Sequence, residues 1–125
     1  MKLLIVDDDA DLRRLLAEHF EGHFDAEVFK AATPGEALHV LEEEQPEGML
    51  LDINLGTRLN GLDILARQRE ISPGTKVIMV TSVSDFASIE RAMELGAVDY
   101  ITKPFTADYL EEAVNAKIAQ HLMCA

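Results

Sequence analysis

The chain has 125 residues, enough for one domain to bury its own core without disulfides or structural metals. Twenty-three acidic residues against eleven basic ones give a formal net charge of −12, which disfavours direct binding of this chain to a nucleic-acid backbone. The single cysteine, Cys124, excludes an intrachain disulfide and a Cys-based zinc site and is typical of a reducing compartment. We expect a cytoplasmic protein, because the first residues meet Asp7 too soon for a signal peptide and no apolar stretch approaches membrane-spanning length.

The chain begins with a predicted strand, an acidic turn and a helix. Residues 2–7 form an apolar run typical of a strand, and Asp7-Asp8-Asp9 ends it. Leucines then recur at helical spacing up to Gly22, which predicts the first helix. A second short strand is expected at residues 26–31.

A helix with a clear start signal follows. Thr33-Pro34-Gly35-Glu36 places Thr at the N-cap, Pro at the first helical position and Glu at the third, which is a capping box. The helix should end before Pro46, because the residue before a proline disfavours helical backbone. The apolar run from Met49 to Ile53 then predicts a buried parallel strand with Asp52 at its carboxyl end.

The second half of the chain continues the alternation of strands and helices. The expected elements are a helix from Gly61 or Leu62 to Ile71, a strand at 76–81, a helix capped by Ser84 and carrying Phe86, Ile89 and Met93, a strand at 98–102, and a last helix after Phe105. Such alternation requires a parallel sheet with right-handed crossovers and helices on both faces. We predict one α/β domain over residues 1–125, a doubly wound five-stranded parallel sheet of the flavodoxin-like order 2-1-3-4-5.

Chemically active side chains gather at one edge of this predicted sheet. Strands one and three are neighbours in that order, so Asp7, Asp8 and Asp52 lie side by side. Crowded carboxylates repel one another, so either one takes a proton or a cation lies among them. A divalent ion is the simpler solution, and an all-oxygen ligand set with room for water favours Mg²⁺.

Two further groups reach the same edge, Lys103 from the fifth strand and the hydroxyl of Thr81 from the fourth. An aspartate beside Mg²⁺, with an ammonium and a hydroxyl nearby, can attack a phosphoryl donor and hold the aspartyl-phosphate product. Taken singly, each residue has a structural reading: surface charge for Lys103, a strand terminator for Thr81, a helix cap for Asp8 or Asp9. Phosphoryl transfer to Asp52 is the interpretation that uses them all.

Four stretches resemble the receiver domain of bacterial two-component response regulators, a family that includes the single-domain chemotaxis regulator. They are Ile5-Val6-Asp7-Asp8-Asp9, Leu51-Asp52-Ile53-Asn54, Val80-Thr81-Ser82 and Asp99-Tyr100-Ile101-Thr102-Lys103-Pro104-Phe105. The resemblance covers the chain from the first strand to the last helix. It implies that Asp52 is the phosphoacceptor, that Thr81 and Lys103 contact the phosphoryl group, and that the Mg²⁺ ligands are Asp7, Asp8, Asp52 and the backbone carbonyl of Asn54.

The resemblance also implies a cis peptide before Pro104 and an aromatic switch at Tyr100. Phosphorylation would then draw Thr81 toward the phosphoryl group and turn Tyr100 inward, changing the surface of the fourth helix, fifth strand and fifth helix. The implied phosphoryl donor is a histidine kinase or a phosphotransfer protein. The resemblance implies that this chain is not an enzyme beyond catalysing its own phosphorylation and dephosphorylation. The resemblance also implies a second copy of the chain as a candidate partner. The last helix, however, carries Glu111, Glu112 and Ala113 and lacks the arginine that is typical of the receiver dimers of winged-helix transcription regulators. We therefore expect a homodimer to be weak or to use a different interface.

One stretch departs from the family pattern. Leu55-Gly56-Thr57-Arg58-Leu59-Asn60-Gly61 has no proline and is one residue longer, so we expect a more mobile loop over the metal.

Three rival classes of protein remain at this point. Asp7-x-Asp9 fits the motif of the aspartate-nucleophile phosphatases, a flavodoxin is disfavoured by the aspartates, and a binding module without phosphorylation is disfavoured by the complete set of site residues. The four histidines, His19, His23, His39 and His121, are expected to be solvated surface residues.

Overall fold

The computed structural model describes residues 1–56, 58–82 and 85–123. Its single sheet has five parallel strands in the order β2-β1-β3-β4-β5, which confirms the predicted fold class and strand order. The strands are β1 (Lys2–Val6), β2 (Glu27–Ala31), β3 (Gly48–Asp52), β4 (Lys76–Ser82) and β5 (Asp99–Lys103).

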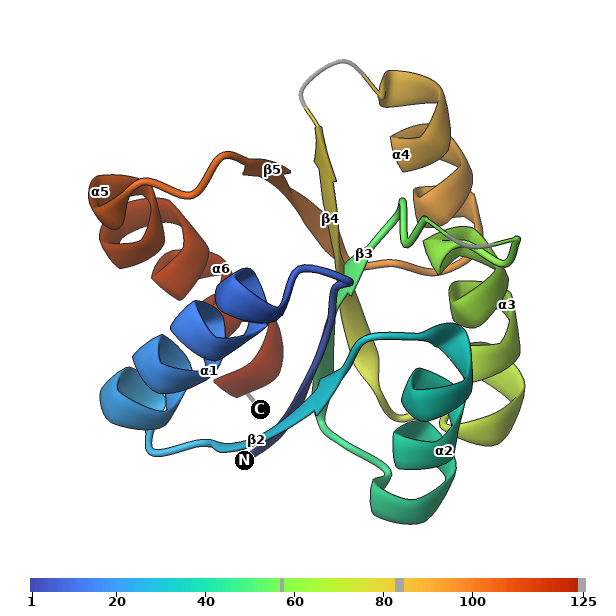
Figure 1. Ribbon diagram of the computed structural model, residues 1–125, viewed down its shortest axis with the longest axis horizontal. Helices are drawn as coiled ribbons and strands as arrows, with labels where there is room; N and C mark the ends of the chain where they lie inside the picture. The colour runs from blue at the N-terminus through green and yellow to red at the C-terminus, as the bar shows by residue number, and fades with distance from the viewer. Residues whose placement is uncertain (57, 83–84, 124–125) are drawn as a thin grey trace.

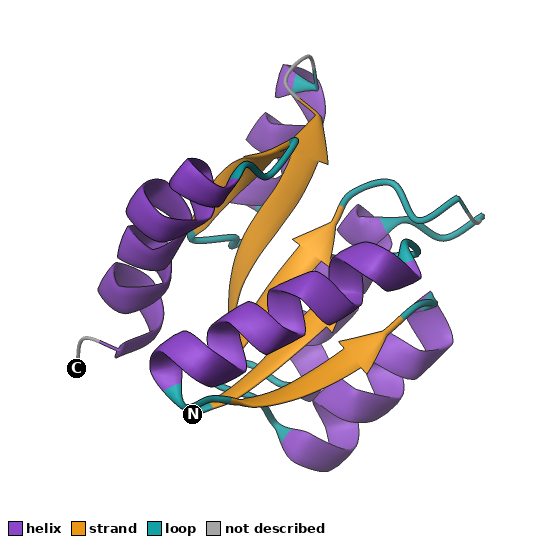
Figure 2. Ribbon diagram, turned by 60° about the vertical axis from the view of Figure 1, so that its left-hand side comes forward, coloured by secondary structure: helices purple, strands orange, loops and turns teal. Residues whose placement is uncertain are grey.

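Helices cover both faces of the sheet (Figures 1 and 2). One layer contains α2 (Pro34–Glu44), α3 (Gly61–Ile71) and α4 (Phe86–Glu94), and the other contains α1 (Ala10–Phe24) and the C-terminal helical segment. That segment runs without a break from Ala107 to Met123 and consists of α5 (Ala107–Tyr109), η1 (Leu110–Val114), α6 (Asn115–Ile118) and η2 (Ala119–Met123). Its η1 and η2 parts are π-type turns, which are rare in helices.

Alternation along the strands divides the core into two clusters. Leu4 and Val6 face the α2, α3 and α4 side, whereas Leu3 and Ile5 face α1 and the C-terminal segment. All five residues of β3 are buried, because this strand lies in the middle of the sheet and is covered on both faces. The central strand can therefore end in a carboxylate that is shielded from water.

Most predicted helix signals agree with the structure. The side chain of Thr33 accepts a hydrogen bond from the Glu36 amide at 3.2 Å, and α2 ends at Glu44, before Pro46. The Glu36 carboxylate, however, accepts a hydrogen bond from the amide of Ala32 and not from that of the N-cap residue, Thr33. The return hydrogen bond of the predicted capping box therefore involves the residue before the N-cap. The first helix also continues past Gly22 to its last residue, Phe24. The C-cap residue that follows, Asp25, has a left-handed backbone with a φ of 53°.

The fourth helix differs from its prediction in two respects. Ser84, the expected cap, lies outside the described residues, and the side chain of Asp85 caps α4 by accepting from the Ser88 amide at 3.4 Å. Among the apolar residues of its predicted stripe, Ile89 is buried, but Phe86 and Met93 are 65% and 44% exposed. The helix therefore contacts the core along a narrower face than its periodicity indicates.

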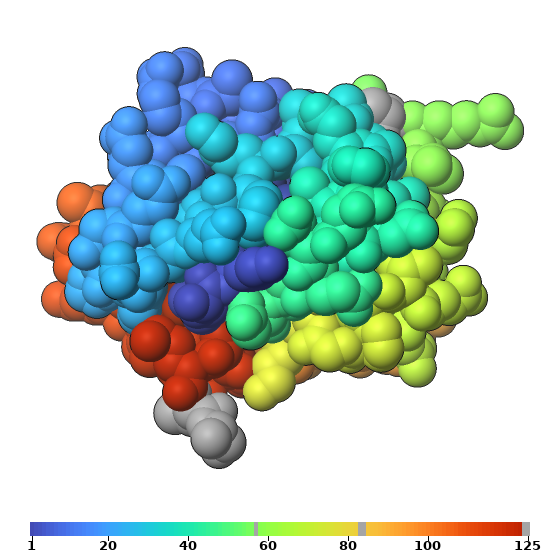
Figure 3. Space-filling view, turned by 90° about the horizontal axis from the view of Figure 1, so that it is seen from below, coloured from blue at the N-terminus to red at the C-terminus, as the bar shows by residue number. Residues whose placement is uncertain are grey.

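Figure 3 shows the molecule from below, where the blue N-terminal residues lie between the green segment that leads into β3 and the red C-terminal helix. The N-terminal residues and the described end of the C-terminal helical segment thus lie away from the edge where the strands end. No helix within the described ranges is long and apolar enough to cross a membrane.

Candidate phosphoacceptor site

The predicted acidic cluster forms where β1 and β3 end. The two strands pair with Val6 opposite Leu51, so the next residue of each strand, Asp7 and Asp52, lies at the same edge. Both residues are buried, at 2% and 5% exposed, whereas Asp8 is exposed. One carboxylate oxygen from each of the three aspartates lies within 4.8 Å of the others.

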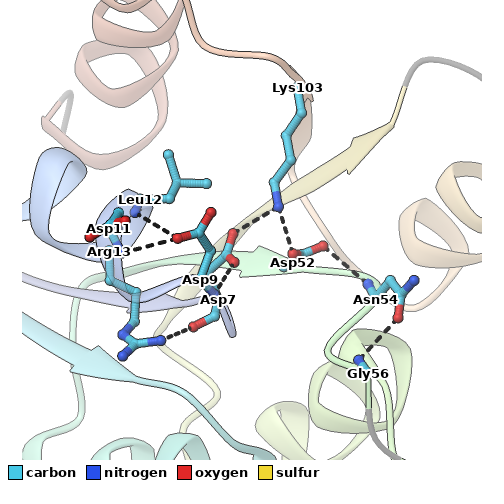
Figure 4. Close-up of polar contacts among 9 residues, drawn as sticks. All are labelled: Asp7, Asp9, Asp11, Leu12, Arg13, Asp52, Asn54, Gly56 and Lys103. Carbon is cyan, nitrogen blue, oxygen red and sulfur yellow. Dashed lines mark hydrogen bonds and ion pairs between the residues drawn. The ribbon is translucent and has the colours of Figure 1, made fainter.

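Lys103 reaches this cluster from the end of β5 (Figure 4). Its Nζ atom lies 2.9 Å from Oδ2 of Asp52 and 3.0 Å from Oδ2 of Asp7. One ammonium against three carboxylates leaves two negative charges uncompensated within the cluster. That balance suits a divalent cation at the exposed side, where Asp8 lies.

Burial and charge shift the titration of the two central groups. Burial raises the pKa of Asp52, the neighbouring charge of Asp7 raises it further, and the hydrogen bond from Lys103 only partly opposes this. Burial by itself would lower the pKa of Lys103, but the hydrogen bonds to Asp52 and Asp7 outweigh it, so this pKa lies above its usual value. The Lys103 ammonium is therefore charged at neutral pH and lies beside the Asp52 carboxylate, which is largely shielded from water.

The start of α1 fixes Asp7 in place. Oδ1 of Asp7 accepts from the Asp9 amide at 2.9 Å, and the Asp7 carbonyl accepts from Nη1 of Arg13 at 2.6 Å. The Asp9 carboxylate caps α1 by accepting from the amides of Asp11 and Leu12, as the sequence predicts for a helix-start residue (Figure 4). Asp9 is thus committed to the helix and not to the acidic cluster, which weakens the Asp-x-Asp phosphatase interpretation.

The loop after β3 folds back over the cluster. The Asn54 amide donates to Oδ1 of Asp52 at 3.1 Å, and Oδ1 of Asn54 accepts from the Gly56 amide at 3.0 Å (Figure 4). Gly56 has a φ of 68°, which the fixed ring of a proline cannot adopt. A Cβ atom at this position would lie 3.3 Å from Oδ2 of Asp8. Glycine at position 56 therefore lets the loop backbone approach Asp8, the exposed carboxylate of the cluster.

An open cavity of about 380 Å³ lies in front of Asp52. Its lining residues are Asp8, Asp52, Ile53, Asn54, Gly56, Thr81, Ser82, Asp85 and Lys103. Thr81 is buried, and its hydroxyl donates to the Ser82 carbonyl at 3.2 Å. The sequence prediction missed Asp85 and Gly56 as lining residues. Asp85 follows the end of β4 by three residues, a position that could have indicated it.

The last two predicted features lie at the two ends of β5. The Lys103-Pro104 peptide bond is cis, as the resemblance implies. Tyr100 lies near the start of this edge strand and is 36% exposed, so its ring is on the surface and not in the core.

The donor set fits a hard divalent cation. Carboxylate oxygens from Asp7, Asp8 and Asp52 converge, and the described residues of the cluster include no histidine or cysteine. The exposed position of Asp8 and the open cavity leave room for water ligands, which Mg²⁺ retains when it binds proteins.

Comparisons with known proteins agree with this geometry. The sequence matches the family model of the response regulator receiver domain over residues 3–115. Sporulation initiation phosphotransferase F of Bacillus subtilis (strain 168) is 36% identical over 116 residues, which cover 91% of this chain and 90% of that protein. The response regulator domain of Thermotoga maritima CheB superposes with a TM-score of 0.84 at 29% identity, over 100% of this chain and 98% of that one.

A response regulator from Burkholderia pseudomallei, solved with a phosphorylated aspartic acid, a calcium ion and citrate, has a TM-score of 0.79 at 26% identity, covering 95% of this chain and 70% of that one. Other relatives are longer: the chain spans between 30% and 47% of the length of the ycf27 transcriptional regulators and of the protein-glutamate methylesterases that it also matches. On its sequence match and its fold, the chain belongs to the response regulator receiver domain family.

Proposed function

We propose that this receiver accepts one phosphoryl group on Asp52 from a histidine kinase or a phosphotransfer protein, in a reaction that requires Mg²⁺. The observation that supports it best is the environment of the Asp52 carboxylate. It is buried at a strand end, with the Lys103 ammonium 2.9 Å away on one side and two carboxylates that can hold a metal on the other. This combination serves an aspartate whose carboxylate must become an acyl phosphate, the mixed anhydride of a carboxylic acid and phosphoric acid.

The residues divide the chemistry among them. A carboxylate oxygen of Asp52 forms the new bond to phosphorus, while the bond from phosphorus to the donor's imidazole nitrogen breaks and the donor histidine keeps that electron pair. Lys103 is placed to neutralise the phosphoryl oxygens. Asp7, Asp8 and Asp52, with the Asn54 carbonyl, would hold the Mg²⁺, which when bound offsets negative charge on the transferring group.

The proposed output is a change of surface around β5. A phosphoryl group on Asp52 adds about −1.5 to −2 charges and three strong acceptors. The Thr81 hydroxyl, which now donates to the Ser82 carbonyl, would turn to the new oxygens. The space it leaves would be filled by the ring of Tyr100, and the surface of α4, β5 and the C-terminal helical segment would change with it.

Two comparisons support this proposal. The relative from Bacillus subtilis is called a phosphotransferase, and the Burkholderia pseudomallei regulator contains a phosphorylated aspartic acid and a calcium ion. The main alternative, an aspartate-nucleophile phosphatase, would release phosphate over many turnovers. Asp9 opposes that alternative, because its carboxylate is used to cap α1.

Intact mass after incubation with acetyl phosphate and Mg²⁺ tests the proposal. We expect the wild type to gain one phosphoryl group per chain, and Asp52→Asn to gain none. Asp108→Asn is the matched control, since it makes the same change at an exposed carboxylate on α5, outside this cavity, and should leave labelling intact. Equal labelling of Asp52→Asn and the wild type would overturn the assignment, and continuous release of phosphate from small esters would favour the phosphatase.

A further inference from the structure

One lysine outside the acceptor site makes an unusual set of contacts with β5. Nζ of Lys117, on α6, donates to Oδ1 of Asp99 at 3.0 Å and to the Tyr100 carbonyl at 2.5 Å. The same nitrogen lies 5.0 Å from the centroid of the Tyr100 ring, which is a cation–π distance. The Lys117 ammonium therefore contacts both the backbone carbonyl and the ring of Tyr100, as well as the carboxylate of Asp99.

Partial burial strengthens these contacts. The side chain of Lys117 is 29% exposed and that of Asp99 is 22% exposed, so both charges are less screened by water than an ordinary surface pair. By contrast, the pair between Arg91 and Glu94 on α4 is 60% and 68% exposed. The Tyr100 ring lies under the Lys117 ammonium while it faces the surface.

Asp99 is itself held by several donors. It accepts from the Tyr100 amide at 2.8 Å, from Lys117, and from Nε2 of His121 at 2.9 Å. Burial raises the pKa of Asp99, but these three hydrogen bonds outweigh burial, so the pKa lies below its ordinary value. The carboxylate that anchors Lys117 is thus ionised at neutral pH. His121, predicted to be a solvated surface residue, belongs to this cluster.

The helix that carries Lys117 is fixed in turn. Asn115, also on α6, is buried and its Oδ1 makes a 2.8 Å hydrogen bond with Nε2 of His19 on α1. His19, also predicted to be a solvated residue, therefore joins the two helices of one layer. The π-type turns η1 and η2 lie on either side of α6, so the register of Lys117 depends on an irregular helix, of a kind that is frequent at functional sites.

We infer that Lys117 is a positioning residue that holds Tyr100 in its outward rotamer in the unphosphorylated chain. This inference rests on the switch proposed above, because the contact between the Lys117 ammonium and the Tyr100 ring is the interaction that must break when Tyr100 turns inward. For Tyr100 to turn inward, its ring must leave the ammonium, whereas the bonds of Lys117 to Asp99 and to the Tyr100 carbonyl can persist. Lys117 thus stabilises one state of the receiver selectively, and its removal shifts the balance of the two states.

Fluorine NMR of protein labelled with 3-fluorotyrosine tests this directly. The chain has two tyrosines, so Tyr100→Phe identifies the Tyr100 resonance. With no phosphoryl donor and no metal, Lys117→Met, which keeps the apolar stem and removes the charge, should raise the ratio of inward to outward Tyr100 by about two- to fivefold. The change appears as a smaller H₂O-to-D₂O solvent shift of that resonance. Lys117→Arg should restore the wild-type shift.

Two controls separate a positioning role from a structural one. Arg91→Met removes a positive charge from α4 that pairs with Glu94 and not with β5, and it should leave the resonance unchanged. Asp99→Asn removes the carboxylate that pairs with Lys117 and should shift the Tyr100 resonance in the same direction as Lys117→Met. This second variant keeps the test valid if Lys117→Met fails to fold.

The result that overturns the inference is a solvent shift of Tyr100 that stays at its wild-type value in both Lys117→Met and Asp99→Asn. This failure is distinct from failure of the proposed function. Absence of label on wild-type Asp52 refutes phosphorylation whatever Tyr100 does, whereas a labelled wild type with an unmoved Tyr100 refutes only the role of Lys117.

Discussion

Gly61 approaches the backbone of Asp52 so closely that no side chain fits at position 61. Its amide donates to the Ile53 carbonyl at 2.8 Å, and a Cβ atom would lie 2.9 Å from Cα of Ile53 and overlap the Asp52 carbonyl oxygen. The first residue of α3 is thus packed against the last residue of β3. This contact links the loop between β3 and α3 to the position of Asp52.

Gly61→Ala should therefore disturb Asp52, the proposed phosphoacceptor, as well as the start of α3. Helix propensity favours alanine, but the clash is with backbone atoms and is expected to lower the free energy of unfolding by about 1–3 kcal/mol. Labelling of Asp52 by acetyl phosphate should slow at the same time. Gly22→Ala is the matched control, because no atom lies within 4 Å of its added Cβ on α1, and it should stabilise the protein by about 0.5–1 kcal/mol. Unchanged stability and labelling in Gly61→Ala would show that the loop can move away without cost.

The metal ligands can be told apart from the helix cap by substitution. Asp8→Ala should weaken Mg²⁺ binding by at least about tenfold while the fold stays intact, because relief of carboxylate crowding is itself stabilising. Asp9→Ala should keep its affinity for Mg²⁺ but lose about 1 kcal/mol of stability with the N-cap of α1. Calorimetric titration with Mg²⁺ and urea unfolding measure the two effects, and equal losses of affinity would contradict the assignment.

The Asp99 cluster predicts a specific dependence of stability on pH. The pKa of Asp99 in the folded state lies below its ordinary value of 3.8, because three hydrogen bonds outweigh burial. Its contribution to stability is therefore fully present above that ordinary value and is lost as the pH falls through the folded-state pKa. Asp99→Asn should be less stable than the wild type at pH 7, and the difference should shrink on acidification below pH about 4.

Urea unfolding at a series of pH values measures this difference. Glu43→Gln provides a comparison, since it neutralises an exposed carboxylate on α2 and should track the wild type throughout. A gap between Asp99→Asn and the wild type that persisted unchanged at pH 3 would mean that the cluster stabilises the fold by packing and not by charge.

The proposed switch predicts where amide exchange should change. Beryllofluoride with Mg²⁺ mimics a phosphoryl group on Asp52, and we expect altered protection within residues 82–105, which connect Thr81 to Tyr100 and Lys103. Asp52→Asn treated in the same way should show none of these changes. Protection changes confined to the loop after Asp52 would refute the switch but leave the acceptor assignment standing.

Local patterns in the sequence predict the individual elements: the wholly apolar run before Asp52 and the cap at Thr33 indicate a strand and a helix from neighbouring residues alone. The alternation of strands and helices then requires a parallel sheet, whereas the order 2-1-3-4-5 comes from the flavodoxin-like arrangement expected for such alternation. Once the strands are parallel and ordered, Asp7 and Asp52 must be neighbours, because adjacent strands that end together bring their next residues together.

The surroundings of each of these side chains depend on the packing of elements that are distant in the sequence. Asp7 is buried, Asp8 faces the cavity and Asp9 caps a helix, although the three are consecutive and chemically identical. Phe86 and Met93 lie exposed on a helix whose spacing alone would bury them. Local pattern could not show this, because burial depends on which elements pack against a residue.

The contacts that tune the site join residues far apart in the chain. Lys103 pairs with Asp52 across 51 positions, and His19 pairs with Asn115 across 96. Likewise, Lys117 and His121 meet Asp99 only because the C-terminal helical segment returns to lie along β5. Hydrogen bonds and ion pairs require approach within about 3 Å, and periodicity in a single sequence specifies faces and ends of elements but not distances of that order.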